Sequence, residues 1–263
     1  MRIVGEPRPH FSFSQMDSYL ACPHKYYLGY EQGLQWCFIP SVVVFGSVIH
    51  SVLEGFHRSL IALAPQSSIH LEKRFEQEWV RETQKDSIRF KNKEEQKVML
   101  QQGKALVELY HEQFHPLKPK AVELDFRMPM IRTDTGELGK RDIVGKIDVV
   151  EEGNIPWEIK TGSKSISQSQ ADSNMQLTLY SWALSMMYGE HVGTVKVVNL
   201  VRTKTPKIQV IETERTPEDH QKLMRVLFGV NDAIEKKVFF ANPKSIYGCG
   251  NCTYSPVCES AMI

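Results

Sequence analysis

The sequence has no hydrophobic stretch long enough to cross a membrane, which needs about 20 mostly apolar residues. Its most apolar run, residues 39–56, is interrupted by Ser41, Gly46, Ser47, His50, Ser51 and Glu54. The first ten residues, MRIVGEPRPH, are polar and lack the apolar centre of a targeting peptide. We therefore expect no membrane partner and a cytoplasmic location.

The chain also lacks a charge excess, an internal repeat and a disulfide pattern. Its 263 residues include 32 Lys and Arg against 31 Asp and Glu, and 41 % of them are hydrophobic. This composition is typical of a globular protein, and the near-zero net charge neither supports nor excludes a nucleic-acid partner. Five cysteines are an odd number. Without a secretory signal, grouped cysteines are better explained as ligands of a metal or cluster than as disulfides.

The most informative stretch is residues 143–162, IVGKIDVVEEGNIPWEIKTG, which predicts two strands joined by a turn at Gly153. Side chains alternate along a strand, so Glu158 and Lys160 share one face while Ile159 points to the core. A loop of three or five residues would place Asp148 opposite Glu158. Two carboxylates on one face beside a lysine favour a divalent-cation site for phosphodiester cleavage. The alternative is a surface hairpin with scattered charges.

Three cysteines lie near the end of the sequence, in the pattern Cys249-x2-Cys252-x5-Cys258. A tetrahedral metal or a cubane cluster needs four ligands, and only Cys22 or Cys37 can supply a fourth thiolate. The spacing alone does not separate zinc from iron-sulfur. A redox-active Cys-x-x-Cys is a weaker third alternative, because no thioredoxin-like strand-to-helix turn surrounds it.

Other patterns predict the surrounding elements. An N-terminal helix capped by Ser14 should break at Pro23, and a helix beginning near Gly46 should carry His50. Residues 121–131 alternate as a strand with Glu123 and Asp125 on one face. We expect an exposed loop at residues 163–173 and then a helix ending at Gly189. On that helix Gln176 and Tyr180 share a face.

These pieces, taken together, resemble the RecB/AddB-type nucleases of the PD-(D/E)xK superfamily. The resemblance is to the iron-sulfur branch that includes the CRISPR-associated RecB-like exonucleases. The segments that carry it occur in the family's order and span most of the chain: SFSQMDSYLACPHKYYLGY, GSVIHSVLE, VELDF, GKIDVV, WEIKTG, MQLTLY and the closing cysteines. One cysteine before the nuclease motifs and three after them form the most specific part of the match.

The resemblance implies a role for individual residues. His50, Asp148, Glu158 and the Ile159 carbonyl correspond to metal ligands, and Lys160 to the catalytic lysine. Glu123 matches a further acidic ligand, with Asp125 as a substitute, and Gln176 and Tyr180 match a helix motif that lines the substrate path. The 4Fe-4S ligands would be Cys22, Cys249, Cys252 and Cys258, leaving Cys37 outside the pattern. The implied cofactors are the 4Fe-4S cluster and Mn²⁺ or Mg²⁺, and an imidazole ligand would favour Mn²⁺.

We expect an α/β fold of the restriction-endonuclease type. A mixed central sheet of about four or five strands would be flanked by helices, and an iron-sulfur cluster held by four cysteines would join the two ends of the chain. Residues 1–44 would form an N-terminal helical segment with one cluster cysteine. Residues 45–240 would form the nuclease core with a helical insertion at 71–115, and residues 241–263 a cluster-binding tail.

The function we expect is metal-dependent cleavage of DNA, as an exonuclease on single strands or free ends, with 5′ to 3′ polarity favoured. The pathway would be DNA recombination or repair, or CRISPR adaptation, with a helicase or integrase partner and a homo-oligomer as further expectations. Two alternatives stay open: a non-catalytic DNA-end-binding adaptor, and a zinc-stapled endonuclease that cuts duplex DNA.

Overall fold

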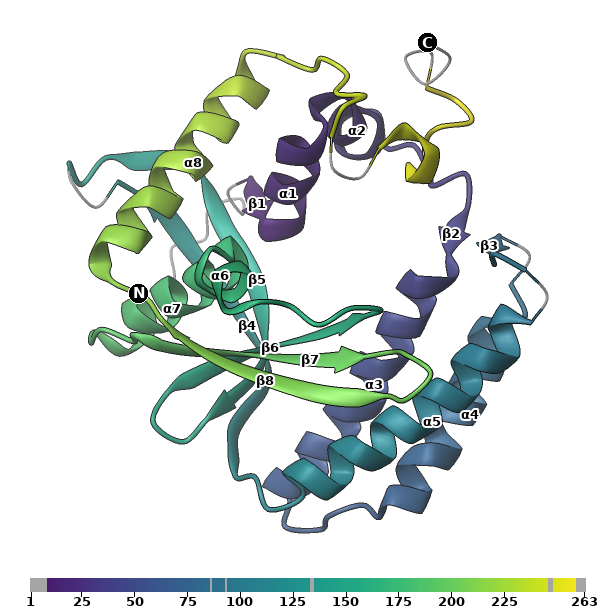
Figure 1. Cartoon of the computed structure of the whole chain (residues 1–263). Helices are drawn as coiled ribbons and strands as arrows, with labels where there is room; N and C mark the ends of the chain where they lie inside the picture. The colour runs from purple at the N-terminus through teal and green to yellow at the C-terminus, as the bar shows by residue number, and fades with distance from the viewer. Residues whose placement is uncertain (1–8, 86, 93, 133–134, 246–247, 259–263) are drawn as a thin grey trace. The chain divides into compact units, whose positions relative to one another are not determined.

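The computed structural model describes residues 9–85, 87–92, 94–132, 135–245 and 248–258 (Figure 1). The chain forms two compact units. Unit 1 comprises Met1–Cys37, Asp125–Lys146 and Thr216–Ile263, and unit 2 comprises Phe38–Leu124 and Ile147–Arg215. Two long strands, β4 (Pro119–Ile131) and β5 (Leu138–Glu151), contribute residues to both units.

A mixed sheet of six strands occupies the described part of the chain, with the order β1-β5-β6-β7-β8 and β4 paired with β5. The bounds of the other four strands are His10–Ser12 for β1, Ile155–Gly162 for β6, Thr194–Val201 for β7 and Lys207–Glu214 for β8. Pairing is parallel for β1 with β5 and for β6 with β7, and antiparallel for β5 with β6 and for β7 with β8. The expected mixed sheet of an α/β fold is confirmed.

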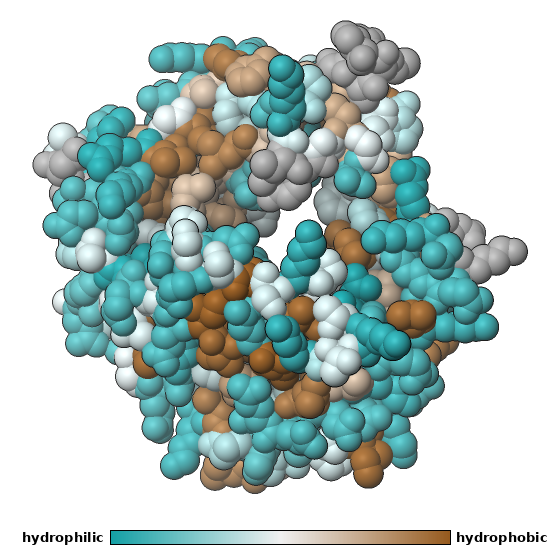
Figure 2. Space-filling view, in the orientation of Figure 1, coloured by the Kyte–Doolittle hydropathy of each residue, from teal (hydrophilic) through white to brown (hydrophobic). Residues whose placement is uncertain are grey.

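In unit 2 one face of the sheet is covered by α3 (Ser41–Ile61) and α5 (Glu95–Phe114), and α4 (Ser68–Glu82) packs against both helices (Figure 1). Their apolar side chains share a core with Trp157 and Ile159 of β6 and with Val198 and Leu200 of β7. The outward surface of α4 and α5 is mainly hydrophilic in Figure 2, as expected for solvated helices. A small two-stranded sheet, β2 (Ile39–Pro40) and β3 (Ile88–Arg89), connects the start of α3 with the chain between α4 and α5.

The opposite face of the unit 2 sheet carries α6 (Gln168–Asp172) and α7 (Met175–Tyr188). Ala171 and Leu177 pack there against Val195, Val197 and Ile211. Because successive side chains of β6 alternate, Glu158 and Lys160 lie on the side opposite to the buried Trp157 and Ile159. That side is the one that α7 covers.

Unit 1 contains α1 (Phe13–Ala21), α2 (Pro23–Tyr26), a π-helical turn η1 (Tyr27–Glu31), α8 (Pro217–Glu235) and a 3₁₀ turn η2 (Cys249–Asn251). Hydrogen bonds join its early and late segments: among them, the Tyr19 hydroxyl donates to the Val238 carbonyl at 2.6 Å, and the His24 N–H to the Phe240 carbonyl at 3.0 Å. Aromatic rings of Tyr19, Tyr26 and Tyr27 pack on Phe239. The first helices and the end of the chain are therefore held together by protein contacts.

Several expected boundaries were wrong. The first helix is capped by Ser12, whose capping box with Gln15 leaves Ser14 inside the helix. The helix that carries His50 begins at Ser41, because burial of Val44 and Phe45 outweighs the weak helix propensity of the valines before Gly46. Part of the expected loop at 163–173 forms α6. Among the described residues no helix has both the length and the apolar character needed to span a membrane.

Candidate active site

The hairpin of β5 and β6 has the three-residue loop that sets the predicted register. Val149 pairs with Trp157 and Glu151 with Ile155, so the turn consists of residues 152–154. Gly153 and Asn154 adopt positive φ angles of 82° and 63°, which these two residue types tolerate in turns. The same register brings Asp148 level with Glu158.

Main-chain pairing between the two strands ends at Val149 and Trp157, one step before the acidic residues. At the next step the Asp148 carboxylate accepts the Ile159 N–H through Oδ2 at 2.6 Å. A side chain thus replaces the main-chain partner where β5 leaves β6. Ile159 itself is 2 % exposed, so its side chain lies in the core while its main chain faces Asp148.

His50, Glu123 and Asp148 form a group with ligand atoms within 4.8 Å of one another. His50 comes from α3, and its Nδ1 lies 3.5 Å from Asp148 Oδ1. Glu123 comes from β4, where it adopts a φ of +50°, an unusual backbone conformation for a non-glycine residue. One imidazole and two carboxylates are a donor set that holds divalent cations.

Asp125 takes no part in this group. Its side chain is 82 % exposed and lies 4.0 Å from Lys146. Of the two acidic residues predicted on this strand, Glu123 therefore joins the cation group and Asp125 does not.

A chain of polar contacts runs from Glu158 to α7. The Lys160 ammonium lies 2.5 Å from Glu158 Oε1 and donates to Gln176 Oε1 at 2.7 Å. The Gln176 amide donates in turn to the Tyr180 hydroxyl at 3.0 Å. All four side chains predicted on the facing surfaces of β6 and α7 therefore meet. The lysine ammonium is held in one place by two oxygen acceptors.

The pKa values of Glu158 and His50 are both raised in this site, and a bound cation would lower them again. Burial, followed by the Asp148 charge, raises the pKa of Glu158 despite the opposing Lys160 ammonium. Burial alone would lower the pKa of His50, but its contact with Asp148 and the charges of Glu158 and Glu123 raise it. Glu158 Oε2 is buried and has no hydrogen-bond partner among the described residues. An orphaned carboxylate oxygen beside further anionic ligands fits a bound divalent cation.

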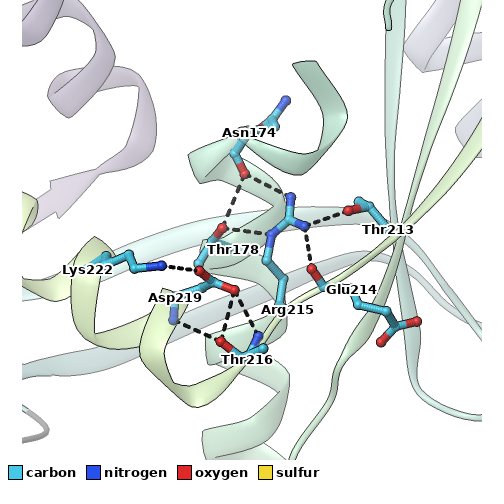
Figure 3. Close-up of polar contacts among 8 residues, drawn as sticks. All are labelled: Asn174, Thr178, Thr213, Glu214, Arg215, Thr216, Asp219 and Lys222. Atoms are coloured by element: carbon cyan, nitrogen blue, oxygen red, sulfur yellow. Dashed lines mark hydrogen bonds and ion pairs between the residues drawn. The ribbon is translucent and has the colours of Figure 1, made fainter. Parts of the chain in front are cut away.

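One residue that supports this site was not predicted. Arg215 is 2 % exposed, and its guanidinium donates to Thr178 Oγ1 at 2.8 Å and Thr213 Oγ1 at 2.9 Å (Figure 3). The guanidinium donates a further bond to the Ala171 carbonyl at 2.7 Å. It also donates to the carbonyl of Asn174, the residue that caps α7. Arg215 thereby fixes the start of the helix that carries Gln176 and Tyr180. No signal in the local sequence indicates this role, because the partners of Arg215 lie up to 44 residues away.

A second group, in unit 1, brings the four predicted cysteines together. Cys22, Cys249, Cys252 and Cys258 line one pocket, and all four are free thiols. Partial burial and the neighbouring thiols of Cys258, Cys252 and Cys22 raise the pKa of the Cys249 thiol. The Asn242 N–H donates to Cys22 Sγ at 3.3 Å. A backbone N–H aimed at a sulfur is a common feature around thiolate ligands.

Cys37 lies outside this pocket. It is exposed, and its N–H donates to the Thr253 carbonyl at 3.1 Å. Of the two candidates for a fourth sulfur ligand, the structure therefore brings Cys22 to the other three.

Comparison with known proteins agrees with this geometry. Residues 10–259 match the sequence model of the PD-(D/E)XK nuclease superfamily. The chain belongs to this superfamily. Its members use divalent metal ions, and a nuclease of this kind has DNA as its substrate class. No match was found among curated proteins.

Comparison with solved structures supports the fold at low sequence identity. A protein from Eubacterium rectale that carries the name of an exonuclease aligns over 96 % of this chain and 87 % of its own, with 12 % identity and a TM-score of 0.58. The structure of SSO0001 aligns over 95 % of this chain and 94 % of its own, with 13 % identity and a TM-score of 0.40, which is too low to indicate a shared fold.

Proposed function

We propose that this PD-(D/E)XK nuclease is a metal-dependent exonuclease of single-stranded DNA that belongs to the iron-sulfur branch of RecB/AddB-type enzymes. The single observation that carries the proposal is the convergence of His50, Glu123 and Asp148 beside the Glu158–Lys160 pair. A non-catalytic DNA-binding adaptor would not require a lysine held between a carboxylate and an amide at the edge of a cation site.

The metal ligands in this proposal are His50, Glu123, Asp148, Glu158 through its orphaned Oε2, and the Ile159 carbonyl. When bound there, Mn²⁺ or Mg²⁺ supplies Lewis-acid polarisation of the phosphate and a lower pKa for a bound water. The imidazole favours Mn²⁺ over Mg²⁺.

The chain's own residues position and neutralise the reacting groups. The Lys160 ammonium, fixed by Glu158 and Gln176, places a positive charge where the phosphate gains negative charge during cleavage. Tyr180 orients the Gln176 amide, so the Gln176 carbonyl oxygen stays directed at Lys160. The Asp148 carboxylate, bound to the Ile159 N–H, has one oxygen fixed and the other directed at His50.

For the cysteine pocket we propose a structural 4Fe-4S cluster on Cys22, Cys249, Cys252 and Cys258. The four cysteines line one pocket, and four thiolates can hold either a zinc ion or a cubane cluster. The preference for the cluster rests on the resemblance of the cysteine pattern to the iron-sulfur branch.

The test of the proposed function compares a linear single strand labelled at its 5′ end with an internally labelled circle of the same sequence, each with Mn²⁺, Mg²⁺ or EDTA. We expect shortening of the linear strand with either metal, faster with Mn²⁺, and an intact circle. Early appearance of short labelled fragments from the 5′ end supports 5′ to 3′ polarity. Cutting of the circle contradicts the exonuclease proposal, and cleavage in EDTA contradicts metal dependence.

A further inference from the structure

Arg202 lies near the carboxyl ends of β6 and β7, as Lys160 does, and is not used by the proposed chemistry. It follows the last residue of β7, and its N–H donates to the Gly162 carbonyl, at the end of β6, with a length of 2.7 Å. Lys160 pairs with Asn199 in the same parallel ladder. The carboxyl ends of adjacent parallel strands are where open α/β sheets bind ligands.

The Arg202 guanidinium has an aromatic face beside it and, among the described residues, lacks a neutralising carboxylate. Its carbon Cζ lies 5.1 Å from the ring centroid of Phe45, which is 1 % exposed. Within the described residues, no carboxylate oxygen lies within the ~4 Å of an ion pair with Arg202. Its partial burial lowers its pKa, while the more distant Glu95 charge opposes that shift. A partly desolvated guanidinium without an anion favours an anionic ligand.

Helix α3 links this arginine to the cation group. Phe45 contacts Arg202, and five residues later His50 contacts Asp148, a separation of about 7.5 Å along a helix axis. Between them, Thr161 Oγ1 lies only 3.2 Å from the position that a Cβ on Gly46 would take. Phosphates follow one another every ~3.4 Å of rise in a B-form strand and more widely in an extended one. The rise between the α3 residue beside Arg202 and the one beside Asp148 is therefore comparable to one or two phosphate spacings.

We propose that Arg202 binds a phosphate of the substrate strand one or two nucleotides from the phosphate that is cleaved. The inference rests on the proposed function and adds a second phosphate subsite to it. Arginine suits this role because its fork of N–H donors binds two phosphate oxygens at once. The strand would run along the first half of α3, where Gly46 lets Thr161 approach the helix closely.

The direct test places one neutral methylphosphonate at each position of a short single strand in turn. We expect wild type to lose roughly ten-fold or more in kcat/KM when the neutral group occupies the Arg202 subsite. Arg202→Gln should show a similar loss on the normal strand, mainly through KM, and no further loss from that methylphosphonate. Arg202→Lys should recover part of the loss. The matched control is Arg58→Gln, an exposed arginine farther along α3 that pairs with Glu54.

Equal sensitivity of wild type and Arg202→Gln to the methylphosphonate at every position would overturn the subsite. A measurement of DNA binding distinguishes failure of the Arg202 subsite from failure of the proposed nuclease function. Fluorescence anisotropy of a labelled single strand should show weaker binding by Arg202→Gln, with a slope of log K against log salt that is shallower by about 0.7. An unchanged slope overturns the subsite whether or not the protein cleaves, whereas a shallower slope without any cleavage by wild type contradicts only the nuclease proposal.

Discussion

Buried His57 gives the stability of this protein a predictable dependence on pH. The side chain comes from α3, is 1 % exposed and has Nε2 3.0 Å from the Tyr110 hydroxyl. Burial lowers the pKa of His57 from 6.5 to about 4, although the Asp148 charge acts in the opposite direction. The folded protein therefore keeps this imidazole neutral at pH values where the unfolded chain protonates it.

The magnitude follows from the two pKa values. Below pH 6.5 the unfolded state binds more protons than the folded state, so the free energy of unfolding falls as pH falls and levels off near pH 4. Each pKa unit corresponds to about 1.36 kcal/mol, so the full loss is about 3.4 kcal/mol. Between pH 7.5 and pH 5.0 the same relation gives a loss of about 2 kcal/mol. That is a large share of the roughly 5–15 kcal/mol by which a typical domain is stable.

The assay is urea unfolding at pH 7.5, 6.0 and 5.0 for wild type and for His57→Gln. Glutamine keeps a hydrogen-bonding group near Tyr110 but does not titrate, and all other ionisable groups are common to both proteins. We expect the stability of wild type to fall by about 2 kcal/mol more than that of the variant between pH 7.5 and pH 5.0. If the free energies of unfolding of the two proteins change in parallel with pH, the lowered pKa of His57 is contradicted.

The remaining predictions concern packing, the cluster and α7. Gly103→Ala should lower the free energy of unfolding by roughly 1–3 kcal/mol, because its Cβ would lie 1.9 Å from the buried Phe75 ring. The matched Gly229→Ala, in open space on α8, should raise the free energy of unfolding by up to ~1 kcal/mol. Thermal unfolding of both variants tests this difference, and equal changes in melting temperature would contradict it. Protein purified without oxygen should contain iron and absorb visible light. Cys22→Ser should lose both properties and the exposed Cys37→Ser should keep them, and the reverse order would disprove the ligand assignment. Gln176→Ala, which removes an acceptor of the Lys160 ammonium, should reduce kcat by roughly 10²-fold with little change in KM, and an unchanged kcat would remove its positioning role.

The hairpin geometry was predictable because both of its determinants are local. Alternation in WEIKTG assigns Glu158 and Lys160 to one face, and the turn residues at 152–154 fix the register. Positive φ at Gly153 and Asn154 follows from residue type. The helix ending at Gly189 was predictable for the same reason, since Gly189 takes the left-handed conformation that ends α7.

Features that depend on distant contacts could not be derived in this way. Nothing in the sequence near Glu123 indicates its φ of +50°. The buried charge of Arg215 is compensated by carbonyl and hydroxyl groups up to 44 residues away, so its local sequence reads as a surface strand end. The approach of Cys22 to the C-terminal cysteines depends on contacts such as that of Tyr19 with Val238.

Lys160, set between Glu158 and Gln176 beside the cation group, is the residue on which the proposed cleavage of DNA depends most. The most direct test compares cleavage of an end-labelled single strand by wild type, Lys160→Ala and Lys140→Ala, with strand binding measured in parallel. Lys140 is a suitable control because its side chain is 80 % exposed and pairs with Glu235. We expect Lys160→Ala to bind DNA almost normally but to cleave it at least ~10³-fold more slowly, with Lys140→Ala unchanged. Cleavage by Lys160→Ala at a rate near that of wild type would contradict the proposed role of this lysine.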